Sequence, residues 1–357
     1  MSSFAIYRLP YASRCTLVGQ TDGTSLALQS PRQLQGREGF VVAPFLASDS
    51  QPILLIRPDR KEVLCSDREI TDCMTGMTFH DPYGELSPGG DRTTYAADFS
   101  VFHAPLVAGR FQKIVLARCA SVPRPAGLSP VDLFLSACKL YPRMFVALVS
   151  TPQSGTWLTA TPEMLLEHSG DEWRTIALAG TMRLSANDLD SEGERQKWSE
   201  KDIREQHYVA TYVASCLQRL GIPYEETSPR TVRAADLLHL RSDFTFTDDS
   251  HIHFSELLEA LHPTPAVCGL PDEEAFRFII SHEHAPRRYY SGYMGPLGQD
   301  THLFVSLRCM LIAARHCLLY AGSGLLKESD EQQEWLETEA KLETMKKCIA
   351  AKKTSIS

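Results

Sequence analysis

The segment that decides the fold class is "RMFVALVSTPQSGTWLTATPEMLLEHSGDEWRTIALAGTMR" (143–183). Its short apolar runs are separated by turns that contain proline, glycine or aspartate, which predicts a series of antiparallel strands. A second segment of the same character, "YYSGYMGPLGQDTHLFVSLRCMLIAARHCLLYAGSG" (289–324), follows a helical region. Because strands follow strands instead of alternating with helices, the sequence predicts an α+β fold and not a parallel βαβ fold.

Helical periodicity lies outside these two segments. Residues 199–220 and 330–352 predict long helices, and 129–142 predicts a shorter one with a serine cap and a terminating proline. The turn-rich segment "DPYGELSPGGDR" (81–92) predicts a flexible loop or a joint between subdomains. Further expected elements are helices at 93–109, 253–263 and 272–284, and strands at 40–48, 53–57, 113–118 and towards the end of 231–247.

Composition excludes several classes of protein. The formal charge of −8, without a basic cluster, argues against nucleic acid as the main partner. No apolar run approaches the ~20 residues of a membrane helix, and the N-terminal sequence does not predict a signal peptide. The ten cysteines are scattered without a C-x-x-C pair, which is typical of reduced thiols rather than disulfides or a zinc site. We therefore expect a cytoplasmic protein.

Two acidic pairs of identical spacing lie far apart in the chain, Asp202/Glu205 and Glu334/Glu337. Residues three apart share one face of a helix, so each pair presents two carboxylates together. Four carboxylates converging from two helices would repel one another unless a divalent cation lay between them, and ligation by oxygen alone suits Mg²⁺. The alternative is that each pair belongs to a solvated helix face.

Three charged residues lie in or beside apolar strands. Lys113 opens "KIVLAR" (113–118), where burial would disfavour the ammonium and make the amine a usable general base; a lysine at a strand edge is the alternative. Glu163 follows Thr161-Pro162, either in an enclosed site as a proton donor or in a surface turn. Arg308 lies within "FVSLRCMLI" and suits a bidentate clamp on a carboxylate.

Glycine-containing strand ends are weaker signals. "YAGSG" (320–324) exposes consecutive N–H groups that can bind an anion, but it does not form a dinucleotide motif. Gly180 and Thr181 end another strand with a close backbone approach and a hydroxyl. The histidines of "HIH" (251–253) and "SHEH" (281–284) have no partner cluster, so they do not predict a zinc site.

Taken together, several motifs in fixed order resemble the chorismate-utilising enzymes, which are similar to component I of anthranilate synthase. The resemblance covers about residues 103–350 and is strongest to the isochorismate synthase branch. The motifs are "KIVLAR", "ATPEMLL", "ALAGT", "SEKDIREQH", "LHPTPAVCGLP", "RRYYSGYMG", "SLRCMLI", "YAGSGLL" and "EWLETEAKL".

The resemblance implies a single interlocked α+β domain. Its two strand-rich halves would stack as a β-sandwich with helices outside and with the active site between the halves. Residues 103–357 would form the catalytic portion, while the variable portion, 1–102, would contribute strands to the same fold. The implied activity is that of an isomerase, which converts chorismate to isochorismate with Mg²⁺ and without an organic cofactor. A monomer is the family's usual state.

Roles are implied position by position. Lys113 matches the base that activates water for attack at C2, and Glu163 matches the acid that protonates the departing C4 hydroxyl. Glu205 and Glu337 match Mg²⁺ ligands, with Asp202 and Glu334 beside them. The implied substrate contacts are Gly180, Thr181, His239, Tyr290, Arg308, Ser323, Gly324 and Lys341.

Departures from the family pattern bear on the choice of reaction. The usual Glu-His is Glu205-Gln206 here, which keeps the metal ligand. Relatives that use ammonia typically have glutamine at the position of Lys113, and those that form a covalent lysine adduct have that lysine at the position of Ala179; both differences favour water as the nucleophile. Salicylate synthase, which goes on to eliminate pyruvate, and a non-catalytic chorismate-binding relative are the alternatives. The residues do not specify whether menaquinone or siderophore synthesis is served; menaquinone is preferred.

Overall fold

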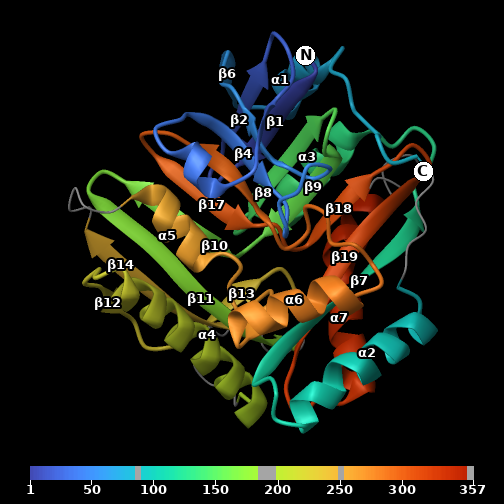
Figure 1. Cartoon of the computed structure of the whole chain (residues 1–357). Coiled ribbons are helices and arrows are strands. Elements are labelled where there is room, and N and C mark those ends of the chain that lie inside the picture. The colour runs from blue at the N-terminus through green and yellow to red at the C-terminus, as the bar shows by residue number, and fades with distance from the viewer. Residues whose placement is uncertain (85–89, 184–197, 248–252, 352–357) are drawn as a thin grey trace.

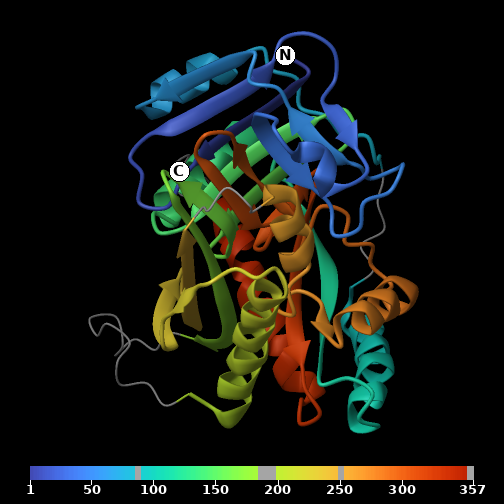
Figure 2. The same cartoon turned by 60° about the vertical axis from the view of Figure 1, so that its left-hand side comes forward.

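The computed structural model describes residues 1–84, 90–183, 198–247 and 253–351. Within these residues the chain forms two antiparallel sheets that stack on each other, with helices on the outside (Figures 1 and 2). The predicted α+β class is therefore confirmed. Parts of two predicted segments, residues 85–89 of the joint and 251–252 of "HIH", lie outside the described residues.

The first sheet has nine strands within the described ranges. Their order is β15 (Gly269–Leu270), β7 (Lys113–Pro123), β19 (His316–Leu325), β18 (Cys309–Ile312), β9 (Gly155–Thr161), β8 (Phe145–Thr151), β1 (Ser3–Arg8), β2 (Cys15–Gln20) and β6 (Arg60–Leu64).

The second sheet has ten strands in the same described part of the chain. Its order is β12 (Glu225–Glu226), β14 (Leu237–Thr247), β11 (Glu172–Arg183), β10 (Met164–Ser169), β17 (Thr301–Val305), β16 (Tyr293–Leu297), β4 (Gly39–Ala43), β5 (Ile53–Ile56) and β3 (Leu26–Leu28), with β13 (Arg230–Ala234) paired to β14.

The helices were largely predicted from periodicity. The structure places them at α1 (Asp67–Met74), α2 (Arg92–Val107), α3 (Pro130–Leu140), α4 (Glu200–Arg219), α5 (Phe254–Leu261), α6 (Asp272–His282) and α7 (Glu331–Ala350), with a 3₁₀ turn at Pro31–Leu34. Ser199 and Asp330 cap α4 and α7 by accepting backbone N–H groups of the first turn. None of the helices within the described residues is long and apolar enough to cross a membrane.

Strand composition follows from burial on both faces. In β8 the side chains of Phe145, Ala147 and Val149 join the core between the two sheets. The alternate residues Val146 and Leu148 join the core beneath the helices that cover the first sheet. A strand buried on both faces reads as a continuous apolar run instead of an alternating one, which is why the 143–150 run contains almost no polar residue.

Each of the two strand-rich segments crosses from one sheet to the other at its midpoint. In the first, β9 belongs to the first sheet and β10 to the second, and Pro162 and Glu163 form the crossing. In the second, β17 and β18 divide in the same way, with Arg308 at the crossing. Since β9 pairs with β18 and β10 pairs with β17, the two crossings lie side by side. The predicted series of strands in 143–183 is therefore divided between the two sheets.

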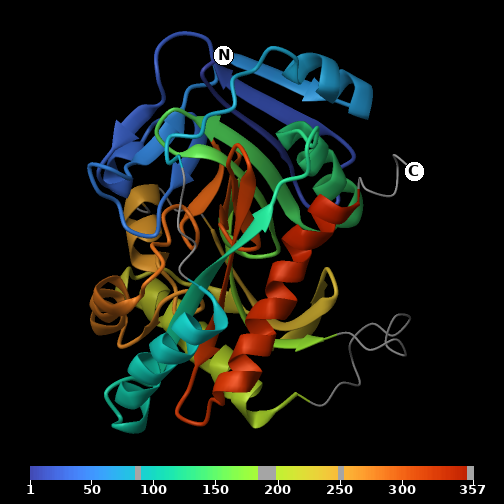
Figure 3. The same cartoon turned by 90° about the vertical axis from the view of Figure 1, so that its right-hand side faces the viewer.

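Long helices cover the sheets next to these crossings. Helix α4 packs on β11 and β14 of the second sheet, while α7 packs on β19 of the first. Figure 3 shows α7, in red, running obliquely from the lower end of the molecule to a little above its middle. Strands β1 to β6, which precede residue 65, extend both sheets. The sequence predicted only two of these six strands.

Candidate active site

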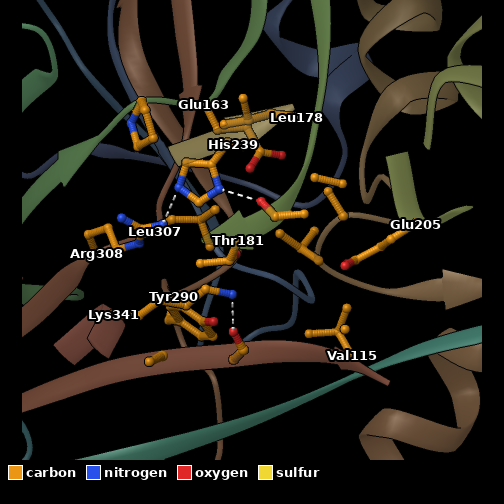
Figure 4. Close-up of a pocket in the computed structure, with 18 residues that line it drawn as sticks. Val115, Glu163, Leu178, Thr181, Glu205, His239, Tyr290, Leu307, Arg308 and Lys341 are labelled. Atoms are coloured by element: carbon orange, nitrogen blue, oxygen red, sulfur yellow. Dashed lines mark hydrogen bonds between the residues drawn. The ribbon is translucent and has the colours of Figure 1, made fainter. Parts of the chain in front are cut away.

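A cavity lies where the two strand crossings meet the first turns of α4 and the middle of α7. The space is about 610 Å³, including the part open to solvent. Nine of the predicted site residues line it, and Figure 4 shows most of them pointing into it from several elements. They are Glu163, Gly180, Thr181, Glu205, His239, Tyr290, Arg308, Gly324 and Lys341.

Glu163 lies at the first strand crossing and is buried. Its backbone is fixed on both sides, because its N–H donates to Thr161 Oγ1 at 3.2 Å and its carbonyl accepts from Val305 N at 2.9 Å. Burial raises the pKa of the Glu163 carboxyl from 4.5 to about 7, against the opposing pull of Lys113 and Arg308. A carboxyl with this pKa can hold a proton near neutrality and release it.

Arg308 occupies the second crossing with a left-handed backbone, at φ 45°. Its Nη2 donates to His239 Nε2 at 3.0 Å, and the other ring nitrogen, Nδ1, lies 2.7 Å from the carbonyl oxygen of Gly180. A guanidinium only donates, so Nε2 is the acceptor and Nδ1 carries the proton. Burial, followed by the charge of Arg308, lowers the pKa of His239 to about 3, so the imidazole is neutral.

The Arg308–His239 arrangement leaves one donor available. Arg308 Nη1 is buried and has no hydrogen-bond partner among the residues that the structure describes. A buried donor without a partner is costly. A guanidinium held by one nitrogen with the other aimed at a cavity is suited to bind an anionic oxygen of a ligand.

Lys341 supplies a second cation to the cavity. Its Nζ donates to the carbonyl oxygen of Gly322 at 2.8 Å and to Glu337 Oε1 at 2.6 Å. Gly322 also allows Tyr290 to approach, since a Cβ at this position would lie 2.8 Å from the Tyr290 hydroxyl. Tyr290 stacks on Tyr320, with ring centroids 5.5 Å apart.

Lys113 and Glu205 form a second ion pair, in which Glu205 lines the cavity and Lys113 lies behind it. Lys113 Nζ lies 2.9 Å from Glu205 Oε1, and the lysine side chain is fully buried. Burial works against the Glu205 anion, but Lys113 and Lys201 hold the pKa of this carboxyl below its ordinary value. Gly324 makes room for the pair, because a Cβ there would lie 2.9 Å from Lys113 Cε and would overlap Glu205 Oε1.

The remaining acidic residues lie behind the cavity wall. Glu334 is buried, with Oε1 2.5 Å from Lys201 Nζ and with no hydrogen-bond partner for Oε2 in the described part of the chain. Burial, followed by repulsion from Glu337, raises the pKa of Glu334 to about 7. Asp202 accepts from Thr181 N at 3.2 Å and from Ser199 Oγ at 2.5 Å, so both of its oxygens already have donors.

These carboxylates do not form a compact cluster. Among the described residues no three histidine, cysteine or acidic side chains lie close enough together to hold a metal ion. Each of three glutamates instead has a lysine partner, in the pairs Glu205–Lys113, Glu334–Lys201 and Glu337–Lys341.

Some predicted residues do not line the cavity, and some neighbours were not predicted. Lys113 reaches it through Glu205, while Ser323 Oγ lies 3.2 Å from the Tyr95 hydroxyl on α2. Lys201 was missed because a lysine at the start of a helix reads as solvated. Arg118, at the end of the same motif as Lys113, binds α7 instead: its Nε donates to Thr338 Oγ1 at 2.8 Å and its guanidinium pairs with Glu339. The predicted residues that lie outside the lining are Lys113, Asp202, Ser323, Glu334 and Glu337.

Comparison with known proteins gives consistent matches. Isochorismate synthase EntC of Escherichia coli is 29% identical over 260 residues, which cover 71% of this chain and 66% of EntC. Isochorismate synthase DhbC of Bacillus subtilis is 29% identical over 294 residues, covering 78% of this chain and 72% of DhbC. The alignment thus spans about two-thirds of the length of these relatives.

Structural comparison extends the match over the whole fold. The crystal structure of a DhbC from Bacillus anthracis, described as a 2,3-dihydroxybenzoate-specific isochorismate synthase, has a TM-score of 0.79 and 24% identity, covering 98% of this chain and 96% of that one. The sequence model of the chorismate binding enzymes matches residues 91–350. Both the fold and the sequence motifs therefore agree, and the chain belongs to the chorismate binding enzyme family.

Proposed function

We propose that this protein is an isochorismate synthase, an isomerase that converts chorismate to isochorismate. The observation that carries the proposal is the pairing of a proton-holding acid, Glu163, with a cationic cavity wall made by Arg308 and Lys341. Relatives named isochorismate synthase in E. coli and B. subtilis support the same assignment.

In the proposed reaction water forms a bond to C2 of the ring while the C4–oxygen bond breaks and the ring double bond shifts. One group must accept the proton of the attacking water, and another must give a proton to the departing hydroxyl. Glu163 suits the second role because its raised pKa lets it arrive protonated. Lys113 is assigned the first role. In the structure Lys113 is paired with Glu205, so it must leave that pair before it can act.

Substrate binding would use the donors that the cavity already presents. Chorismate carries two carboxylates, and Arg308 Nη1 has no partner within the described structure, so it can donate to one of them. Neutral His239 holds the guanidinium in place from the other side. Lys341 and the backbone N–H groups near Gly324 lie at the same wall and would complete the anion contacts.

The donor set fits Mg²⁺, which we propose as the required metal. Mg²⁺ usually takes about one or two protein carboxylates and completes its shell with water and an anionic ligand, so a compact cluster of three is not needed. Glu205 and Glu337 would hold it, with Glu334 and Asp202 behind them, and the unpartnered Oε2 of buried Glu334 supports this placement. When bound, the metal would neutralise and orient the ring carboxylate.

Incubation with chorismate and Mg²⁺, followed by chromatography of the products, tests the proposed function. We expect isochorismate without salicylate or pyruvate, and product formation about 10²–10⁴-fold slower in a Glu163→Gln variant purified in the same way. Equimolar pyruvate and salicylate would transfer the assignment to salicylate synthase. Chorismate binding without any turnover would identify a non-catalytic relative.

The setting of the reaction is part of the same proposal. The ten scattered cysteines are typical of a reducing compartment, so we place the enzyme in the cytoplasm. Isochorismate would supply either menaquinone or siderophore synthesis. Relatives in the comparison include the MenF isochorismate synthase and a vibriobactin-specific isochorismate synthase. The monomeric state stays a prediction.

A further inference from the structure

Lys201 is the one lysine of the three glutamate–lysine pairs to which the family resemblance assigns no role. It lies on the first turn of α4, one residue before Asp202, and its ammonium crosses to Glu334 on α7. Its side chain is 24% exposed and that of Glu334 is 2% exposed, so the pair is largely removed from water. A lysine that only solvated a helix face would point away from α7.

The contacts of Lys201 place its charge among several carboxylates. Its Nζ lies 2.5 Å from Glu334 Oε1, and the charges of Glu337 and Glu205 also act on its ammonium. Glu205 and Glu337 have lysine partners of their own, Lys113 and Lys341. Lys201 is therefore the only partner that a substrate-contacting role does not already account for among the described pairs.

We propose that Lys201 is a built-in counter-ion that occupies the position of the metal's charge in the ligand-free enzyme and keeps the affinity for a divalent cation low. The inference rests on the proposed function in one respect, since it takes Glu205, Glu334 and Glu337 as the acidic wall of the metal site. A divalent cation that enters must either displace the ammonium from Glu334 or lie close to it, and both oppose binding. The same pairing stabilises the acidic wall when no metal is bound, because an unpaired buried carboxylate such as that of Glu334 would be unfavourable.

The test is a titration of the full-length protein with Mn²⁺ alone, without chorismate, in which electron paramagnetic resonance measures the free ion. Mn²⁺ favours the same carboxylate oxygens as Mg²⁺. In Lys201→Met the apolar stem is kept and the charge is removed, so we expect Mn²⁺ to bind at least ~10-fold more tightly than in the wild type. Lys201→Arg keeps the charge and should retain the weak wild-type affinity.

A matched control is available on α7. Lys346 is 31% exposed and pairs with Glu339 at 3.0 Å and Glu343 at 3.1 Å, away from the cavity. Lys346→Met should leave the Mn²⁺ affinity unchanged. Adding Glu334→Gln to Lys201→Met should abolish the gain, because it removes the carboxylate that Lys201 neutralises.

The direction in which the Mn²⁺ affinity changes in Lys201→Met distinguishes a counter-ion role from a merely structural one. Loss of packing or local order would weaken metal binding, whereas loss of a competing charge strengthens it. An unchanged or lower Mn²⁺ affinity in Lys201→Met, in a protein that unfolds cooperatively on heating, would overturn the proposal. Should that variant not fold, Lys201→Gln gives the same comparison. Because the titration contains no chorismate, its result does not depend on whether the enzyme makes isochorismate.

Discussion

Replacing Glu163 with glutamine separates the catalytic use of this carboxyl from its effect on stability. Glutamine has nearly the same shape but cannot give up a proton. Loss of a positioned general acid typically reduces the rate by about 10²–10⁴-fold, and we expect kcat to fall within this range. In the wild type kcat/KM should decrease about tenfold for each pH unit above ~7, because Glu163 must be protonated to act and its pKa is about 7.

The same substitution, which lowers kcat, should raise the stability of the folded protein. The pKa of Glu163 is raised in the folded state, from 4.5 to about 7. Protonation is therefore favoured by folding, and the folded protein loses stability as the pH rises from about 4.5 to about 7. At high pH, the raised pKa of Glu163 corresponds to a loss of about 3 kcal/mol in the free energy of unfolding. Glu163→Gln removes the ionisation, so its free energy of unfolding should exceed that of the wild type by up to about 3 kcal/mol at pH 8 and by little near pH 4.5.

Urea unfolding at both pH values, together with the chromatographic activity assay, measures the two effects. Glu167 provides a matched control on the adjacent strand, because its hydrogen bond to His302 holds its pKa below the ordinary value. Glu167→Gln should lower stability at pH 8 and leave kcat nearly unchanged. If Glu163→Gln were no more stable than the wild type at pH 8, the carboxyl would not be an acid held neutral by burial, and the reasoning would be refuted.

Three further predictions concern the Lys113–Glu205 pair and the proposed metal site. Lys113→Ala should lose about 10²–10⁴-fold in kcat while still binding chorismate, and Lys113→Arg should fail as well; near-normal turnover of the arginine variant, measured in the same assay, would return Lys113 to a structural role. Activity should vanish with EDTA and return with Mg²⁺, and Glu205→Gln or Glu337→Gln should abolish turnover while circular dichroism shows an intact fold; full activity in metal-free buffer would contradict the metal site. Gly324→Ala should impair turnover more than binding, because the added methyl group meets the Lys113–Glu205 pair; wild-type kcat would show that the pair can move aside.

The sequence indicated which residues would lie together, but it did not indicate the path of the chain through the cavity. Glu163, Arg308 and Glu205 were identified from motifs, and the structure brings them to one cavity. The two strand crossings at Glu163 and Arg308 were not predicted. Apolar periodicity reports that a segment is a buried strand, but it does not tell which sheet the strand joins. Only the pairing of β9 with β18 and of β10 with β17, which are distant in sequence, decides that.

The N-terminal strands and Lys201 were missed for a related reason. "SFAIYR" and "CTLVGQ", which form β1 and β2, are short and mix polar with apolar residues, so they give no strong local signal. They are strands because β8 offers β1 an edge to pair with. Lys201 is partly buried because α7 lies across from α4 and presents Glu334. Both features depend on long-range packing, which overrides local propensity.

Charge balance links the proposed metal to the proposed substrate. In the structure Glu205, Glu334 and Glu337 are each matched by a lysine, so the charges of these three carboxylates are compensated within the protein. A divalent cation alone would add two positive charges to this arrangement, and a substrate with two carboxylates alone would add two negative charges. Together they would add none. Each ligand should therefore raise the affinity for the other by the same factor, since coupling between two binding events is reciprocal. The paired lysines would thus make metal and substrate bind cooperatively.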